Sequence, residues 1–229
     1  MKKAWLIVFL VFLMPVAMAT DLYSMDSLEL NLNVDGSFEL IPTKDSAKLQ
    51  QASADLLLYP REDLRQSIIR WESSGIVKDD FVSFVWNDKN IDKKNFGYNA
   101  LLQTNNRRVK VQEKIPFPLK TEDISGFEQY LLPTETIDSD HPEVIAKASE
   151  LAEGEDDLFA VAFKLASWVE ENIDYDLKTV DVSVSKKGSW VLQNRKGVCV
   201  EMTSLFVAMA RSLGIPARFV SGISYTNDE

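Results

Sequence analysis

The chain has 229 residues, of which 45% are hydrophobic and 26% are charged, and its formal net charge is −10. This length and balance fit one large domain or two modest ones with a self-sufficient core, and they exclude disorder over most of the chain. The acidic balance also disfavours a nucleic-acid partner, because an acidic surface repels a phosphate backbone.

Residues 1–19 have the pattern of a secretory signal peptide. Lys2 and Lys3 give the positive start, residues 5–13 are apolar, and Ala17-Met18-Ala19 is a small-residue cleavage pattern. The apolar run is short for a bilayer span, and no later segment is apolar enough to cross one. We therefore expect an exported protein, extracellular or in the cell envelope, with no membrane span beyond the signal sequence.

Residues 20–136 carry the signals of β-strands. Residues 28–34 alternate between apolar and polar side chains, and Asp35-Gly36 is typical of a hairpin turn that leads into a further strand at 37–40. Further strands are expected at 54–59, 67–71, 80–86, 96–103 and 108–111. Short strands at this spacing predict a β-sandwich-like N-terminal domain.

The hydrophobic period changes to that of helices in residues 137–229. Asp140 and Glu143 resemble a capping box, and Pro142 is tolerated in a first helical turn. A first helix is expected to run on to residue 152, a second over 158–173, and a short helical turn at 189–193 after a polar loop.

A third helix is expected over 199–213. Apolar residues cover most of its circumference and leave a narrow polar stripe of Glu201, Ser204 and Arg211, which is typical of a central, buried helix. Gly214 is a natural C-terminal cap, and residues 217–225 favour a strand.

Cys199, the only cysteine in the sequence, opens this third helix. A helix start exposes unpaired backbone N–H groups and the positive end of the helix dipole, and both stabilise a thiolate, which is the nucleophilic form. The alternative interpretation is a small apolar core residue, since free cysteine is among the most buried residue types. An odd cysteine in an exported protein favours intermolecular pairing or a reactive role.

The segments Gly197-Val198-Cys199 and Leu213-Gly214-Ile215-Pro216-Ala217-Arg218, joined by the third helix, form one block. This block closely resembles the core of the transglutaminase-like superfamily of papain-like cysteine enzymes. The helix that ends near Tyr175 is also similar to the helix before the active-site loop of that family. The resemblance covers about residues 140–225, and it implies an α+β fold in which a β-sandwich-like domain precedes the helical first half of a transglutaminase-like core.

The resemblance implies a Cys-His-Asp triad in which Cys199 attacks a carboxamide carbon to form a thioester, which an amine or water then resolves. It implies a protein or peptide substrate and acyltransferase or hydrolase activity. The sequence has no His/Cys cluster that suits a metal and no Gly-rich phosphate loop, so we expect no cofactor or metal. The backbone N–H of Cys199 is a candidate oxyanion donor, and Gln193 and Trp190 are candidates for the second donor.

The sequence departs from the family pattern after Tyr225. The histidine and aspartate of the family lie on the next two strands, and Asp228 comes too early to be that aspartate. The only histidine, His141, belongs to a helix-start signal, so we assign it no catalytic role. We expect an inactive fragment of a longer enzyme, organised as residues 1–19, 20–136 and 137–229. The alternative is a complete, non-catalytic interaction module of the cell envelope.

Overall fold

The computed structural model describes residues 25–44, 46–90, 92–107, 110–180 and 185–222. The expected signal peptide at 1–19 lies outside the described residues. The chain divides into two compact units, residues 1–109 and residues 110–229, and each is described by itself. Within the described parts, no helix combines the length and the apolar character that crossing a membrane requires.

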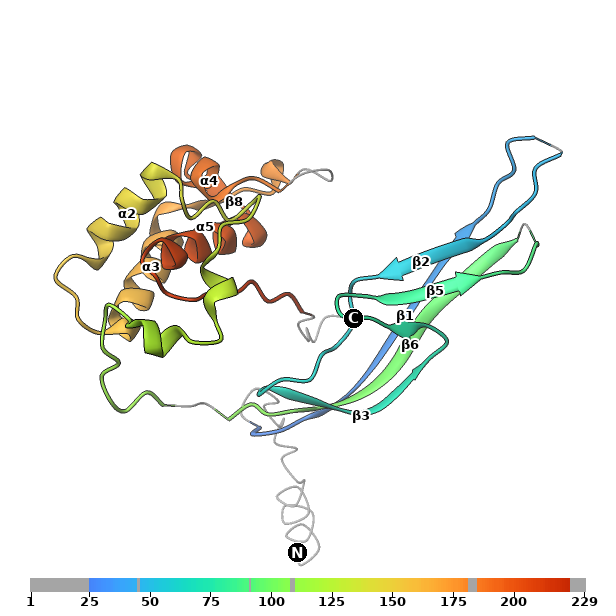
Figure 1. The fold of residues 1–229 in the computed structure, drawn as a ribbon, viewed down its shortest axis with the longest axis horizontal. Helices are drawn as coiled ribbons and strands as arrows, with labels where there is room; N and C mark the ends of the chain where they lie inside the picture. Colours follow the sequence, from blue (N-terminus) through green and yellow to red (C-terminus); the bar gives the residue numbers. More distant parts are fainter. Residues whose placement is uncertain (1–24, 45, 91, 108–109, 181–184, 223–229) are drawn as a thin grey trace, which may run out of the picture. The chain divides into compact units, whose positions relative to one another are not determined.

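The first unit consists of two antiparallel sheets of three strands each (Figure 1). One sheet has the order β1-β6-β3 and the other β2-β5-β4. The strands are β1 (Glu29–Glu39), β2 (Ala52–Leu56), β3 (Gln66–Ser73), β4 (Ile76–Val77), β5 (Val82–Trp86) and β6 (Lys93–Thr104).

Apolar side chains from both sheets share one core, because alternate residues of a strand point to the same face. The buried residues Tyr98, Ala100 and Leu102 of β6 pack with Leu56 of β2. The ring of Phe84 in β5 lies 5.7 Å from that of Phe96 in β6, measured between centroids. Two sheets that pack across such a layer form the expected β-sandwich-like arrangement. Together with the helices of the second unit, this confirms the α+β fold class.

The expected hairpin turn at Asp35-Gly36 is wrong. These residues lie inside β1, where Asp35 pairs with Gly97 and Gly36 pairs with Phe96 of β6. A Cβ added to Gly36 would come within 2.5 Å of the Phe96 ring, so the glycine is needed for a close approach across the sheet and not for a turn. The strand therefore continues to Glu39.

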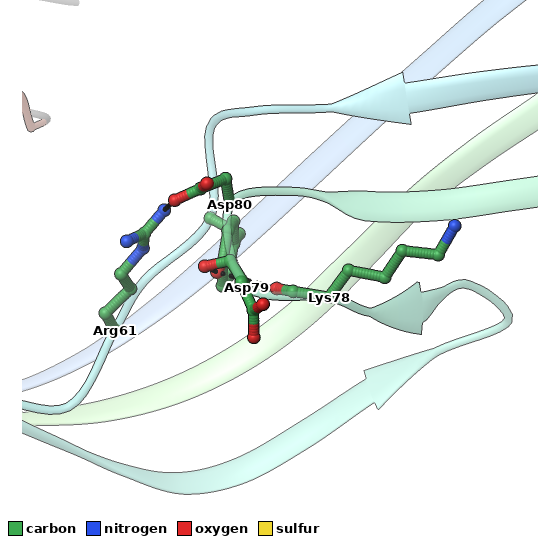
Figure 2. A network of polar contacts seen from close by, with 5 residues as sticks. Arg61, Lys78, Asp79 and Asp80 are labelled. Carbon is green, nitrogen blue, oxygen red and sulfur yellow. Dashed lines mark hydrogen bonds and ion pairs between the residues drawn. The ribbon is translucent and has the colours of Figure 1, made fainter.

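A polar network joins the connection after β2 to the turn between β4 and β5 (Figure 2). The hydroxyl of Tyr59, on the connection after β2, donates to the carbonyl oxygens of Lys78 at 3.1 Å and Asp79 at 2.9 Å, both on the turn between β4 and β5. Figure 2 shows the guanidinium of Arg61 pointing toward the carboxylate of Asp80, and the two groups pair at 3.4 Å. Both partners of this ion pair are exposed, so its contribution to stability is small.

A buried lysine anchors the connection between β5 and β6. Lys94 is only 4% exposed, and its ammonium group contacts the carboxylates of Asp88 at 2.7 Å and of Asp92. The hydrogen bond from Lys94 holds the pKa of Asp88 below its usual range. The same bond raises the pKa of Lys94, with a further contribution from Asp92. The charge is tolerated in the interior because two carboxylates compensate it.

The second unit is mainly helical. Its elements, most of them labelled in Figure 1, are η3 (Thr121–Ile124), η4 (Glu128–Leu131), α2 (Pro142–Ala152), α3 (Leu158–Asn172), β7 (Asp174–Tyr175), η5 (Leu177–Thr179), α4 (Gly188–Asn194), β8 (Lys196–Gly197) and α5 (Cys199–Ser212). The expected helices are all present.

Helix α2 begins at Pro142, and its cap is His141 and not the expected Asp140. The Nδ1 atom of His141 accepts a hydrogen bond from the backbone N–H of Glu143 at 3.3 Å. Asp140 therefore lies one position too early to cap the helix, while the carboxylate of Asp157 caps α3 by accepting from Phe159 N at 3.0 Å.

Helix α5 is the centre of the second unit, as the sequence predicts. It packs against α2, α3 and α4, and Leu205, Ala208 and Met209 are completely buried. The three residues of the expected polar stripe, Glu201, Ser204 and Arg211, are buried too. The stripe therefore faces the interior of the unit, where the side chains of Glu201 and Arg211 bond to backbone groups.

Residues 110–136, which the sequence grouped with the β-rich domain, contact the helical unit. Phe117 N donates to Asp156 O at 3.1 Å, and Ala217 N donates to Tyr130 O at 3.1 Å. Arg211 donates to the carbonyl oxygens of Leu132 and, at 2.8 Å, of Ala217. The described part of the expected strand at 217–225, residues 217–222, is irregular, because these bonds engage Ala217 outside any sheet.

Candidate functional site

The path of the chain into α5 is set by a short parallel pairing that the sequence did not reveal. Helix α4 ends at Asn194 and is followed by the C-cap residue Arg195, which has φ 56°. Strand β8 then pairs with β7 so that Tyr175 lies opposite Gly197. Asp174 N donates to Arg195 O at 2.9 Å, and Asp176 N donates to Gly197 O at 3.1 Å. These bonds fix the backbone immediately before Val198.

The guanidinium of Arg195 also lies over the ring of Trp168 in α3, 4.6 Å from its centroid. A cation in this position is attracted by the electron-rich face of the indole ring. The left-handed turn that follows α4 is thus held to α3 by a side chain as well as by its backbone.

Cys199 is the first residue of α5, and its thiol is free and exposed. The interpretation of Cys199 as a buried core residue therefore finds no support in its surroundings. The N–H groups in the first turn of a helix lack intrahelical acceptors, and the dipole gives this end a positive potential. An exposed thiol at such a position is accessible to an electrophile.

The residue before the cysteine cannot cap the helix with its side chain. Val198 is the N-cap residue and has no side-chain acceptor. The carboxylate of Glu201 instead accepts a hydrogen bond from the backbone N–H of Val198, with Oε2 and N separated by 3.2 Å. Only 4% of Glu201 is exposed, so this carboxylate lies inside the unit, beneath the turn that carries Cys199.

Glycine is required at position 197 by the same turn. A Cβ added to Gly197 would lie 2.9 Å from Cβ of Glu201 and 3.7 Å from Cγ1 of Val191. Contacts below about 3 Å between such atoms are repulsive, so a larger residue would push the buried glutamate aside. The Gly-x-Cys pattern thus has a packing reason in this chain.

The side chains proposed as second oxyanion donors have other contacts. The amide of Gln193 donates to Oε2 of Glu143 in α2 at 2.8 Å, and Trp190 packs against the core around α5. In the described residues no hydrogen bond joins either side chain to Cys199. The backbone N–H of Cys199 thus stays the candidate donor, and the second donor stays a prediction.

His141 is engaged as the cap of α2, where its Nδ1 accepts from Glu143 N. As the only histidine of the sequence, it leaves Cys199 without a hydrogen-bonded imidazole in the described residues. Those residues also contain no group of three or more His, Cys, Asp and Glu side chains that could hold a metal ion.

Comparisons with known proteins agree with the geometry. Residues 145–229 match the family model of the transglutaminase-like superfamily. The fold is similar to the crystal structure of a candidate cysteine protease from Cytophaga hutchinsonii, with a TM-score of 0.56 and 14% sequence identity. The match covers 84% of this chain and 66% of that protein, so the chain spans slightly less than two thirds of its length. Among curated proteins, none matches.

Proposed function

We propose that this chain, which carries a transglutaminase-like segment at residues 145–229, uses Cys199 as the nucleophile in thiol-dependent acyl transfer or amide hydrolysis. The observation that carries the proposal is the exposed thiol of Cys199 at the first residue of a buried helix, directly after the glycine turn of the matched segment. The name of the structural neighbour, a candidate cysteine protease, supports a protein or peptide as the acyl donor.

The proposed reaction begins with attack of the Cys199 thiolate on a carboxamide carbon. The new S–C bond gives a tetrahedral intermediate whose oxygen carries the negative charge, and the backbone N–H of Cys199 is placed to bind that oxygen. The C–N bond then breaks, and the amine leaves with a proton and leaves a thioester on the enzyme. Attack by water gives hydrolysis, and attack by a second amine gives acyl transfer.

The proton transfers in both steps require a general base of nearly neutral pKa, usually histidine. His141 supports no such role, because its Nδ1 is engaged at the start of α2. We therefore propose that Cys199 reacts faster with acyl donors whose leaving group needs no proton, such as activated esters, than with carboxamides.

The test is the rate at which iodoacetamide alkylates Cys199 at about pH 6, compared with the free thiol of N-acetylcysteine. We expect the rate for Cys199 to exceed that of N-acetylcysteine, because the free N–H groups and the dipole at the start of α5 favour negative charge on the sulfur. A rate at or below that of N-acetylcysteine would contradict the proposal and would favour the non-catalytic interaction module.

We also propose that the protein is exported. The support is the sequence of residues 1–19, with its two lysines, its apolar run and the Ala17-Met18-Ala19 pattern. Expression of the full chain in a bacterial host, followed by N-terminal sequencing, should give a mature protein that begins at Thr20. A product in the cytoplasm that retains Met1 would contradict export.

A further inference from the structure

We propose that Glu201 is a positioning residue for Cys199: its buried carboxylate fixes the turn that carries the Cys199 backbone N–H. The inference rests on the proposed function, because it assigns that N–H to the oxyanion of acyl transfer. It adds a residue that does not itself touch the substrate.

Both backbone polar groups of Val198 are bonded to α5. Its N–H donates to Oε2 of Glu201 at 3.2 Å, and its carbonyl oxygen accepts from Met202 N at 2.9 Å. The peptide unit between Val198 and Cys199 contains that carbonyl and the Cys199 N–H. With the residue held at both ends, this peptide unit cannot rotate, so the direction of the Cys199 N–H is fixed.

Glu201 supplies the acidic half of a capping box, so it also stabilises the start of α5 by accepting from the N–H of Val198. The residue is only 4% exposed, which brings its carboxylate beneath Val198 and not out into solvent. A contribution to stability and a contribution to the position of Cys199 therefore have to be separated by experiment.

The neighbouring residues also serve this arrangement. Gly197 leaves room for Cβ of Glu201, and Val198 has no side-chain acceptor of its own. The N–H of Cys199 has no acceptor among the described residues, so it is available to a ligand. A side-chain cap at position 198 would compete for the donors of this first turn, whereas Glu201 holds the turn from inside.

The experiment compares two reactions of Cys199 in the 229-residue chain. Para-nitrophenyl acetate transfers its acetyl group to the thiolate, which develops an oxyanion and releases para-nitrophenolate. Iodoacetamide alkylates the same thiolate by displacement of iodide, and no oxyanion forms. The ratio of the two rates therefore reports the oxyanion donor independently of the amount of thiolate.

The variants are Glu201→Gln and Glu201→Met, which have similar length and no charge. Gln retains an oxygen that can accept from Val198 N, and Met does not. We expect the ratio of acylation to alkylation to fall about tenfold or more in Glu201→Met and to stay within about twofold of wild type in Glu201→Gln. Glu171→Gln, an exposed change on α3, is the control and should leave the ratio unchanged.

The inference would be overturned if the ratio of acylation to alkylation were the same in wild type and both variants. It would also be overturned if Glu201→Gln and Glu201→Met lowered that ratio equally. If Glu201→Met does not fold, Glu201→Asp replaces it, since the shorter side chain withdraws the carboxylate from Val198 and should lower the ratio. A Cys199 that is unreactive toward both reagents would refute the proposed function instead. In that case hydrogen exchange of the Val198 amide tests the role of Glu201. The Val198 N–H should be protected from exchange in wild type and in Glu201→Gln, and unprotected in Glu201→Met. An unprotected Val198 N–H in wild type would overturn the inference.

Discussion

Substitution of Arg211 by methionine should destabilise the helical unit. The Arg211 side chain joins α5 to two other segments, because Nη1 donates to Leu132 O and Nε donates to Ala217 O at 2.8 Å. The residue is 9% exposed, and burial lowers the pKa of its guanidinium, although the group remains charged at neutral pH.

The magnitude follows from these two bonds. Each hydrogen bond from a charged donor contributes about 1.5–3 kcal/mol, and Arg211→Met loses both. The desolvation cost of the guanidinium disappears at the same time, which offsets part of the loss. We expect the free energy of unfolding to fall by about 2–4 kcal/mol.

The assay is equilibrium unfolding in urea followed by the fluorescence of the tryptophans in the helical unit. Arg218→Met is the matched control, because Arg218 lies close by on the chain and is exposed, so its loss should cost at most about 0.5 kcal/mol. Equal effects of the two substitutions would refute the reasoning that residues 110–136 are held to α5 through Arg211.

Three further predictions concern the two cores. Leu205→Ala, at a fully buried position of α5, should reduce the unfolding free energy by about 2–5 kcal/mol in urea titrations. Gly97→Ala should prevent stable folding of the β unit, seen as a loss of its circular dichroism, because Gly97 has φ 155° and a Cβ would lie 2.0 Å from Val34 O. The lowered pKa of Asp88 means that its bond to Lys94 stabilises the unit above the usual value of 3.8 and is lost as pH falls through the folded pKa. Asp88→Asn should therefore weaken the dependence of the melting temperature on pH below about pH 4.

The sequence predicts the helices well because their signals are local. The apolar period, Asp157 before α3 and Gly214 after α5 all act within a few residues of the chain. The start of α2 differs by one position, because the Nδ1 atom of His141 and not the carboxylate of Asp140 accepts from Glu143 N. Local rules do not distinguish two adjacent polar caps.

The errors arise where a distant segment decides the local structure. Asp35-Gly36 has the composition of a hairpin turn, but the Phe96 ring of a strand far along the sequence requires the glycine. The pairing of Tyr175 with Gly197 likewise joins segments far apart in the sequence, and two-residue strands leave no periodic signal.

The sequence predicted the nucleophile of the candidate site, Cys199, but it did not predict that Glu201 holds the turn before it. Gly197 and Cys199 stand in a recognisable pattern, whereas the sequence showed Glu201 only as part of a narrow polar stripe on α5. A capping box is recognised in a sequence by a polar residue at the N-cap position. Here the N-cap residue is Val198, so the sequence does not identify Glu201 as the N3 residue of a capping box. Only the burial of Glu201 and its bond to Val198 N reveal its place beneath the cysteine.

The central claim, that Cys199 is an acyl-accepting nucleophile, is tested most directly by the site of acylation. The chain is treated with para-nitrophenyl acetate, and the acetylated residue is identified by peptide mass spectrometry together with the burst of para-nitrophenolate. The account predicts one acetyl group per chain on Cys199 and no burst in Cys199→Ser. A burst that persists in Cys199→Ser, or acetylation confined to lysines, would contradict it.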